Sequence, residues 1–243
     1  MNNALMKRLA LIISVLCFSA SHVSAQGWRD WNSGSDQRSN SQSQGGRQGS
    51  GGTPGQFDFY VLALSWSPSY CQGAGSRRSS NQCDAGKPYD FVVHGLWPQF
   101  ERGFPSNCGP SGRNPTRAAM DKAAEIYPDQ GLARHEWNKH GTCAGGSATD
   151  YFEDVAHARN KIVIPDMLRL PRETLHTTPI EIERAFTAAN KGLRADMMSV
   201  QCNRNVLQEV RICFSKDLRE FVTCPEVNRS GCRAREISVP SPR

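Results

Sequence analysis

The chain has 243 residues, a formal net charge of +6 and nine cysteines. This length allows one domain with a sizeable core, and the charge is compatible with polyanionic partners without indicating one. No two cysteines stand at CxxC spacing, which disfavours a zinc ribbon.

The first 25 residues are typical of a cleaved signal peptide. Lys7 and Arg8 precede an apolar run of twelve residues, Leu9–Ala20, and Val23–Ala25 supplies small residues at the spacing that signal peptidase reads. Twelve apolar residues are too few for a permanent membrane anchor. We therefore expect the protein to be exported, either secreted or periplasmic, without a membrane anchor.

Cleavage after Ala25 would remove Cys17 and, with Lys7 and Arg8, would lower the net charge from +6 to +4. Eight cysteines would remain: Cys71, Cys83, Cys108, Cys143, Cys202, Cys213, Cys224 and Cys232. An even number of cysteines on an exported chain predicts four disulfides. Their spacing alone leaves the pairing open.

Residues 26–56 are dominated by Ser, Gly, Gln, Asn and Arg, and they predict a flexible leader. One folded domain is expected over residues 57–243. It opens with a strand over Phe57–Trp66, stopped by Pro68 and buried on both faces. A second strand is expected over Tyr89–His94, with Gly95 ending it.

Helices and one hairpin are expected in the rest of the chain. The predicted helices cover Pro115–Tyr127, Leu132–His140 with Gly141 as its C-cap, a segment from Thr149 or Asp150, and Thr178–Asn190 with a capping box. The hairpin pairs Met197–Cys202 with Val206–Phe214 and turns at Asn203-Arg204. Because no regular βαβ repeat is present, the predicted class is α+β, a single domain with a mostly antiparallel central sheet flanked by helices.

Two segments carry chemistry. The first, His94–Pro98, places a histidine at the end of an apolar strand, where a satisfied core histidine is the plainer alternative. The second, His135–Cys143, holds four ionisable side chains within six residues, and a charged helix surface is its plainer alternative. His135 and His140 are five residues apart and would point about 140° from each other on a helix. The HExxH motif of zinc proteases needs histidines four residues apart, at i and i+4, so a zinc site is disfavoured.

Taken together, the two segments resemble the ribonuclease T2 family. The family blocks HGLWP and HEWxKHGTC are present as His94–Pro98 and His135–Cys143, and Phe59–Trp66 is similar to the family's opening strand. The resemblance covers roughly Phe57 to the C-terminus and is strongest through Cys143. It implies that residues 57–243 form a catalytic domain.

The family's reaction is transesterification of RNA to a 2′,3′-cyclic phosphate, without metal or cofactor. The resemblance implies that His140 is the general base, His94 the general acid, His135 a phosphate ligand, and Glu136 with Lys139 a stabiliser of the transition state. The two histidine roles are exchangeable on sequence grounds alone. DNA has no 2′-hydroxyl and should not be cleaved, and the protein is expected to be a monomer.

Two further residues are implicated in binding the RNA substrate. Trp97 would stack on a base, although a core tryptophan that braces the His94 turn is the alternative. Gln99 stands where many family members have an acidic residue, and this departure predicts a weak base preference.

The resemblance also implies a disulfide pairing. The expected pairs are Cys71–Cys83, Cys108–Cys143, Cys202–Cys232 and Cys213–Cys224. Two other functions compete with the ribonuclease hypothesis: a non-catalytic exported protein that binds RNA or another polyanion, and a secreted metallohydrolase.

Overall fold

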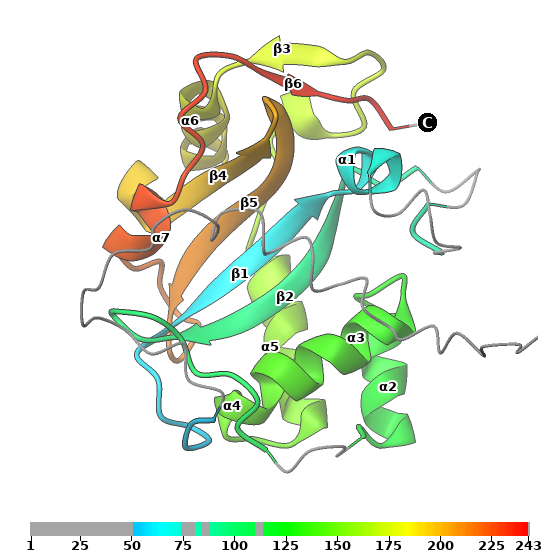
Figure 1. Ribbon diagram of the computed structural model, residues 1–243, viewed down its shortest axis with the longest axis vertical. Helices are drawn as coiled ribbons and strands as arrows, with labels where there is room; N and C mark the ends of the chain where they lie inside the picture. The colour runs from blue at the N-terminus through cyan, green and yellow to red at the C-terminus, as the bar shows by residue number, and fades with distance from the viewer. Residues whose placement is uncertain (1–50, 74–80, 84–87, 110–113, 243) are drawn as a thin grey trace, which may run out of the picture. The chain divides into compact units, whose positions relative to one another are not determined.

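The computed structural model describes residues 51–73, 81–83, 88–109 and 114–242 (Figure 1). The predicted signal peptide and residues 26–50 of the predicted leader lie outside them. Two leader residues within the described part are bonded to the domain: the Gly51 amide donates to the Ser106 carbonyl and the Gly55 amide to the Cys143 carbonyl, each at 2.9 Å. The ordered chain therefore begins before Phe57.

A six-stranded sheet forms the centre of the domain, in the order β2-β1-β5-β6-β3 with β4 paired to β5. Its strands are β1 (Phe59–Trp66), β2 (Phe91–Gln99), β3 (Leu175–Thr177), β4 (Met198–Asn203), β5 (Val206–Ser215) and β6 (Ile237–Val239). Every pairing is antiparallel except that of β5 with β6. The α+β class and the mostly antiparallel sheet are thus confirmed.

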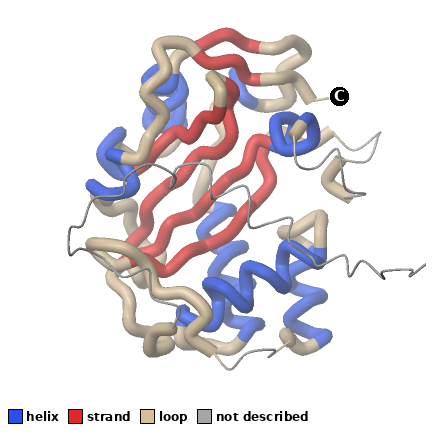
Figure 2. Tube along the Cα trace, in the orientation of Figure 1, coloured by secondary structure: helices blue, strands red, loops and turns tan. Residues whose placement is uncertain are grey.

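Helices lie mainly on one side of this sheet and at its ends (Figures 1 and 2). They are α1 (Ser67–Gln72), α2 (Arg117–Ala124), α3 (Gln130–Glu136), α4 (Thr142–Ala144), α5 (Ala148–Asn160), α6 (Pro179–Ala189) and α7 (Pro225–Arg229). Helix α5 passes behind β1 and β2 and contacts both strands, whereas α6 and α7 contact β4. Capping boxes begin α5 at Ser147 and α6 at Thr178, the latter as predicted.

The central strand β1 is buried on both faces, as expected, and the two faces differ in character. The Leu62 face carries Tyr60, Leu62, Leu64 and Trp66. Its large side chains pack toward the helices, where the Phe91 ring lies 4.9 Å from Trp66 and 5.9 Å from Phe186 of α6. The Ala63 face carries Phe59, Val61, Ala63 and Ser65.

Strand β2 does not end at Gly95, contrary to the prediction, but continues to Gln99. Ala63 pairs with Gly95 and the next β1 residue, Leu64, pairs with Val93, so His94 is the extra residue of a β-bulge. A glycine inside a strand pattern can mark either an end or a bulge, and pairing with β1 decides between them. The bulge re-aims the His94 side chain.

The helix predicted to end at Gly141 is longer and changes type. After α3 comes a π-helical turn, Trp137–Gly141, followed by α4 and a cap at Gly145, whose φ is +95°. Gly141 stays helical, with φ at −61°, and its missing side chain leaves room for the Trp137 and Tyr151 rings, which a Cβ would overlap. The prediction of Gly141 as the C-cap is wrong, and Gly145 takes the left-handed cap position.

All four expected disulfides are present: Cys71–Cys83, Cys108–Cys143, Cys202–Cys232 and Cys213–Cys224. The last two form a nested pair that ties β4 and β5 to the C-terminal segment. The predicted β4–β5 hairpin is confirmed, with positive φ at Arg204 and Asn205, one residue later than expected.

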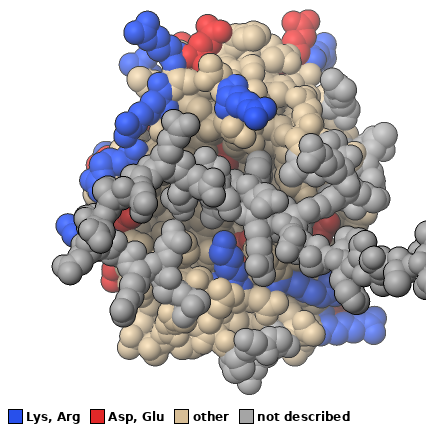
Figure 3. Space-filling model, in the orientation of Figure 1, with Lys and Arg blue, Asp and Glu red and all other residues tan. Residues whose placement is uncertain are grey.

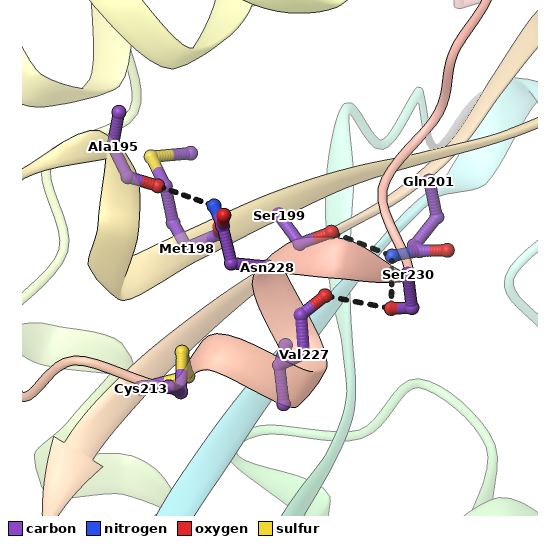
Figure 4. Close-up of a disulfide and its surroundings, with 9 residues drawn as sticks. Ala195, Met198, Ser199, Gln201, Cys213, Val227, Asn228 and Ser230 are labelled. Atoms are coloured by element: carbon purple, nitrogen blue, oxygen red, sulfur yellow. Dashed lines mark hydrogen bonds between the residues drawn. A yellow bond between two sulfur atoms is a disulfide. The ribbon is translucent and has the colours of Figure 1, made fainter.

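Around Cys213, helix α7 is held against β4 by side-chain hydrogen bonds (Figure 4). The Asn228 amide donates to the carbonyls of Ala195 and Met198 at 2.7 and 2.9 Å. The Ser230 hydroxyl donates to the Val227 carbonyl at 2.6 Å. Val227 of α7 packs against the buried cluster of the Ala63 face, so α7 covers this end of the face, and the β2 end carries the polar groups described next.

Candidate active site

Side chains from β2 and β5 meet across β1 on the Ala63 face. His94 from the bulge and Glu209 of β5 lie with Nδ1 and Oε2 2.7 Å apart. The β1 residues between them are Ala63 and Ser65, which pair with β5 at Arg211 and Glu209. Because these two side chains are small, longer ones from the flanking strands can reach each other above them.

Glu209 is engaged at both carboxylate oxygens. The second oxygen, Oε1, accepts a hydrogen bond from Nε of Arg211 at 2.7 Å, and the residue is only 4% exposed. The Arg211 guanidinium carbon lies 5.2 Å from the centroid of the Trp97 ring. A buried carboxylate needs such partners, since an unpaired charge in this position would be costly.

A second buried carboxylate approaches from α3. Glu136 is 1% exposed and accepts a hydrogen bond from Nε1 of Trp97 at 2.8 Å. Its other oxygen lies 3.8 Å from Nε2 of His94. A Cβ at position 95 would overlap the Glu136 carboxylate, so Gly95 allows this close approach.

His140 of the π-helical turn lies against the same indole. Its ring is stacked on Trp97, with centroids 5.4 Å apart and planes inclined by 30°, while the His94 ring meets Trp97 edge-on at 5.2 Å. His140 is 4% exposed, and its buried Nδ1 has no hydrogen-bond partner within the described residues. Both histidines therefore border Trp97.

The π-helical turn explains how the second segment is arranged. Hydrogen bonds in a π-helix join residues five apart, so residues at this spacing come closer to one face than on an α-helix. The predicted divergence of about 140° between His135 and His140 assumed a regular α-helix. Positive charge on His135 and Lys139 acts on His140.

A disulfide holds a loop against this turn. Cys108 is bonded to Cys143, the Cys108 amide donates to Thr142 Oγ1 at 3.1 Å, and the Asn107 amide donates to the Lys139 carbonyl at 2.8 Å. The same loop carries Phe104, whose ring centroid lies 6.4 Å from that of His140. The Cys108–Cys143 disulfide thus anchors a loop that places a half-buried aromatic ring near His140.

The two histidines have opposite pKa shifts. Burial lowers the pKa of His94, but the hydrogen bond to Glu209 and the negative charges of Glu209 and Glu136 outweigh it, so the pKa is raised. Burial also lowers the pKa of His140, and the positive charges of Lys139, His94 and His135 lower it further, to well below its ordinary value. One imidazole thus favours the protonated form and the other the neutral form.

The pKa values of the two buried carboxylates, Glu136 and Glu209, are also shifted in opposite directions. Burial raises the pKa of Glu136, because Trp97 and nearby cations only partly compensate for lost hydration. Burial acts in the same direction on Glu209, but Arg211 and His94 reverse the effect and hold its pKa at about 2. Glu209 is therefore ionised throughout the neutral and mildly acidic range.

Of the predicted site residues, His94, Trp97, Glu136 and His140 are brought into direct contact, and His135 and Lys139 adjoin His140. The buried Trp97 ring, covered by Arg211 and His140, has the contacts expected of a bracing residue, and base stacking on it stays a prediction. Gln99 lies on the same face at the end of β2, where its amide donates to the Pro98 carbonyl at 3.1 Å.

Sequence reasoning missed Glu209, Arg211 and Phe104. A signal was present for the first two: charged residues two apart in an otherwise apolar strand must share one face. Among the described residues, no group of three or more histidines, cysteines or acidic residues is placed to hold a metal ion. None of the helices in the described part of the chain is long and apolar enough to cross a membrane.

Comparison with known proteins agrees with this geometry. The family model for the ribonuclease T2 family matches residues 57–224. A ribonuclease of Aeromonas hydrophila is 36% identical over 195 residues, covering 72% of this chain and 80% of the relative. Ribonuclease DdI of Dictyostelium discoideum is 29% identical over 207 residues, covering 77% and 86%.

Solved structures give the same result. RNase NT, crystallised in complex with 5′-AMP, superimposes with a TM-score of 0.62 at 26% identity and covers 77% of this chain and all of that one. The fold and these matches define the protein as a ribonuclease. The chain belongs to the ribonuclease T2 family.

Proposed function

We propose that the protein is an exported endoribonuclease that cleaves single-stranded RNA by transesterification. The observation that carries the proposal is the placement of two oppositely shifted imidazoles, His94 and His140, within 5.4 Å of one indole ring. Groups whose surroundings drive their pKa values apart are suited to separate acid and base roles.

In the first part of the reaction, neutral His140 takes the proton of the RNA 2′-hydroxyl. The 2′-oxygen then attacks the adjacent phosphorus and forms a new P–O bond. The nucleophile belongs to the substrate, so the protein need supply only proton transfer and charge stabilisation.

In the second part, the bond between phosphorus and the 5′-oxygen breaks. His94 gives its proton to that oxygen, which leaves as a hydroxyl, and a 2′,3′-cyclic phosphate remains. Lys139 and His135 supply positive charge beside the phosphate, and Glu136 with Lys139 stabilises the transition state. DNA is not a substrate because it lacks the attacking hydroxyl.

Export is supported by the N-terminal sequence and by the cysteines. Every cysteine after Ala25 is paired in a disulfide, which fits an oxidising compartment outside the cytoplasm. Lys and Arg side chains lie at several points around the margin of the face in Figure 3, and they suit a polyanionic substrate. We expect a monomer. We also expect a weak base preference, because Gln99 stands where many family members have an acidic residue.

The test is incubation of the purified protein with RNA and with DNA in excess chelator, from pH 4 to 8, with analysis of the product ends. We expect RNA cleavage that yields 2′,3′-cyclic phosphate and intact DNA. RNA binding without cleavage would identify a non-catalytic binding protein, and loss of cleavage in chelator would identify a metallohydrolase.

A further inference from the structure

The imidazole of His94 faces a buried ion pair on β5 that the mechanism above does not use. Nδ1 of His94 lies 2.7 Å from Oε2 of Glu209, and the other Glu209 oxygen lies 2.7 Å from Nε of Arg211. The pair is nearly closed to solvent, since the side-chain exposure is 5% for Glu209 and 22% for Arg211.

We propose that Glu209 and Arg211 are positioning residues for the general acid. Glu209 accepts the Nδ1–H bond of His94, so Nε2 carries the proton delivered to the leaving oxygen, and Arg211 fixes the Glu209 carboxylate. This inference rests on the proposed ribonuclease function. It adds two residues to that site that lie more than a hundred positions after His94 in the sequence.

The geometry fixes the direction of proton transfer. Nε2 of His94 points to the side of α3, where Oε1 of Glu136 is 3.8 Å away. When Nε2–H breaks and the proton bonds to the 5′-oxygen, the imidazolium becomes a neutral ring that keeps Nδ1–H. Glu209 stays ionised before and after the step, because Arg211 and His94 hold its pKa at about 2. It orients the acid and stabilises its charge, without receiving a proton.

Burial has the largest effect on the protonation of His94, and Glu209 is the strongest of the charged groups that oppose it. Glu209 and Arg211 face it from β5, Glu136 from α3, and His140 from the π-helical turn. The intervening β1 residues, Ala63 and Ser65, are uncharged. Loss of the Glu209 charge would leave the Glu136 carboxylate opposed by Arg211, and the imidazolium would lose its hydrogen-bonded counter-charge.

Arg211 also connects the acid to the base. Its guanidinium carbon lies 5.2 Å from the Trp97 centroid, and the Trp97 ring stacks on His140. The guanidinium that holds the Glu209 carboxylate therefore also packs on the indole against which the base rests. Through this contact the β5 pair fixes both imidazoles relative to one ring.

The first experiment compares Glu209→Gln with the wild type on an RNA substrate across pH. We expect kcat to fall about 10- to 100-fold, as for other partners that orient a functional histidine, with little change in KM. The high-pH limb of the rate profile should move to lower pH, because His94 loses the charge that keeps it protonated. Glu183→Gln, which changes a half-buried carboxylate on α6 in the same way, should behave as the wild type.

A second substrate separates positioning of the acid from general damage. In a uridine 3′-phosphate ester of 4-nitrophenol, the leaving group departs as 4-nitrophenolate without a proton donor. Cleavage of this ester therefore does not need the general acid. On this ester Glu209→Gln should approach the wild-type rate. Equal losses on RNA and on the ester would overturn the proposal, as would an unmoved high-pH limb.

Folding of the variant is checked by its melting temperature and by its disulfide content. If Glu209→Gln does not fold, 15N NMR of the wild type gives the answer, with the His94 signals assigned by their absence in His94→Phe. We expect the neutral ring to carry its proton on Nδ1, and a proton on Nε2 would refute the inference. Failure of the proposed function itself is a different result, namely wild-type protein that does not cleave RNA at all.

Discussion

The surroundings of His94 and those of His140 are opposite in sign, although both imidazoles lie against Trp97. His94 stands on a bulged strand between two carboxylates, with Nδ1 bonded to Glu209 and Nε2 near Glu136. His140 stands in a π-helical turn beside the cations Lys139 and His135. Burial alone would lower the pKa of both residues, so charge placement is what separates them. The same side chain thus favours the protonated form in one place and the neutral form in the other, which is the basis of the proposed acid and base roles.

The largest expected effect comes from removing either imidazole. His94→Phe and His140→Phe should each lower kcat/KM on RNA by about 10²- to 10⁴-fold, the usual contribution of a general acid or base. On an ester with 4-nitrophenol as leaving group, His94→Phe should recover most of the rate and His140→Phe should not. Recovery of the rate in His140→Phe and not in His94→Phe would show that His140 is the acid and His94 the base.

The pH profile of the wild-type enzyme tests whether the pKa values of His94 and His140 are shifted in opposite directions. The base must be neutral, and the lowered pKa of His140 means that the rate falls only well below pH 6.5. The acid must be protonated, and the raised pKa of His94 means that the rate falls only above pH 6.5. We therefore expect a broad maximum around this value in kcat/KM. A single narrow peak with both limbs meeting near pH 6.5 would contradict the separation.

A smaller effect is expected when one cation beside the base is removed. Lys139→Gln should raise the pKa of His140 and move the low-pH limb of the profile to higher pH. The high-pH limb should stay in place, because Lys139 is not among the groups that shift His94. We also expect a loss of about tenfold in kcat from weaker stabilisation of the phosphate charge. Arg169→Gln, an exposed cation near the Asp166 carboxylate, is a suitable control.

The last effect concerns stability and the indole that both rings share. Trp97→Phe keeps an aromatic ring but removes the Nε1–H bond to Glu136, which leaves a buried carboxylate oxygen without that donor. The expected loss is about 1–3 kcal/mol in the free energy of unfolding, measured by urea denaturation. A loss near zero would mean that Glu136 finds another partner.

Local signals in the sequence were sufficient for the elements that depend on neighbouring residues. Thr178, Pro179 and Glu181 predict the start of α6, where the structure has both hydrogen bonds of the capping box. The β4–β5 hairpin was also predictable from two apolar runs around a polar turn. In both cases the residues that determine the element lie within a few positions of it.

The remaining features depend on contacts with distant parts of the chain. The bulge at His94 exists only in register with β1, and the π-helical turn packs its Gly141 against Tyr151 of α5. Glu209 is separated from His94 by 115 positions, so no local pattern connects them. The histidines and the charged residues of the second segment could therefore be named from the sequence, whereas Glu209, whose hydrogen bond and charge raise the pKa of His94, could not.

The bulge places His94 outside the regular alternation of side chains along β2. On the N-terminal side of His94, Phe91 and Val93 face the same side as Leu62, and on the C-terminal side Leu96 and Pro98 do so. Without residue 94 these two runs would join into one unbroken alternation, and no apolar side chain would change sides. His94 is thus an insertion into a strand that is already complete. Deletion of residue 94 would therefore keep the register of β2 against β1 and remove the imidazole from the site.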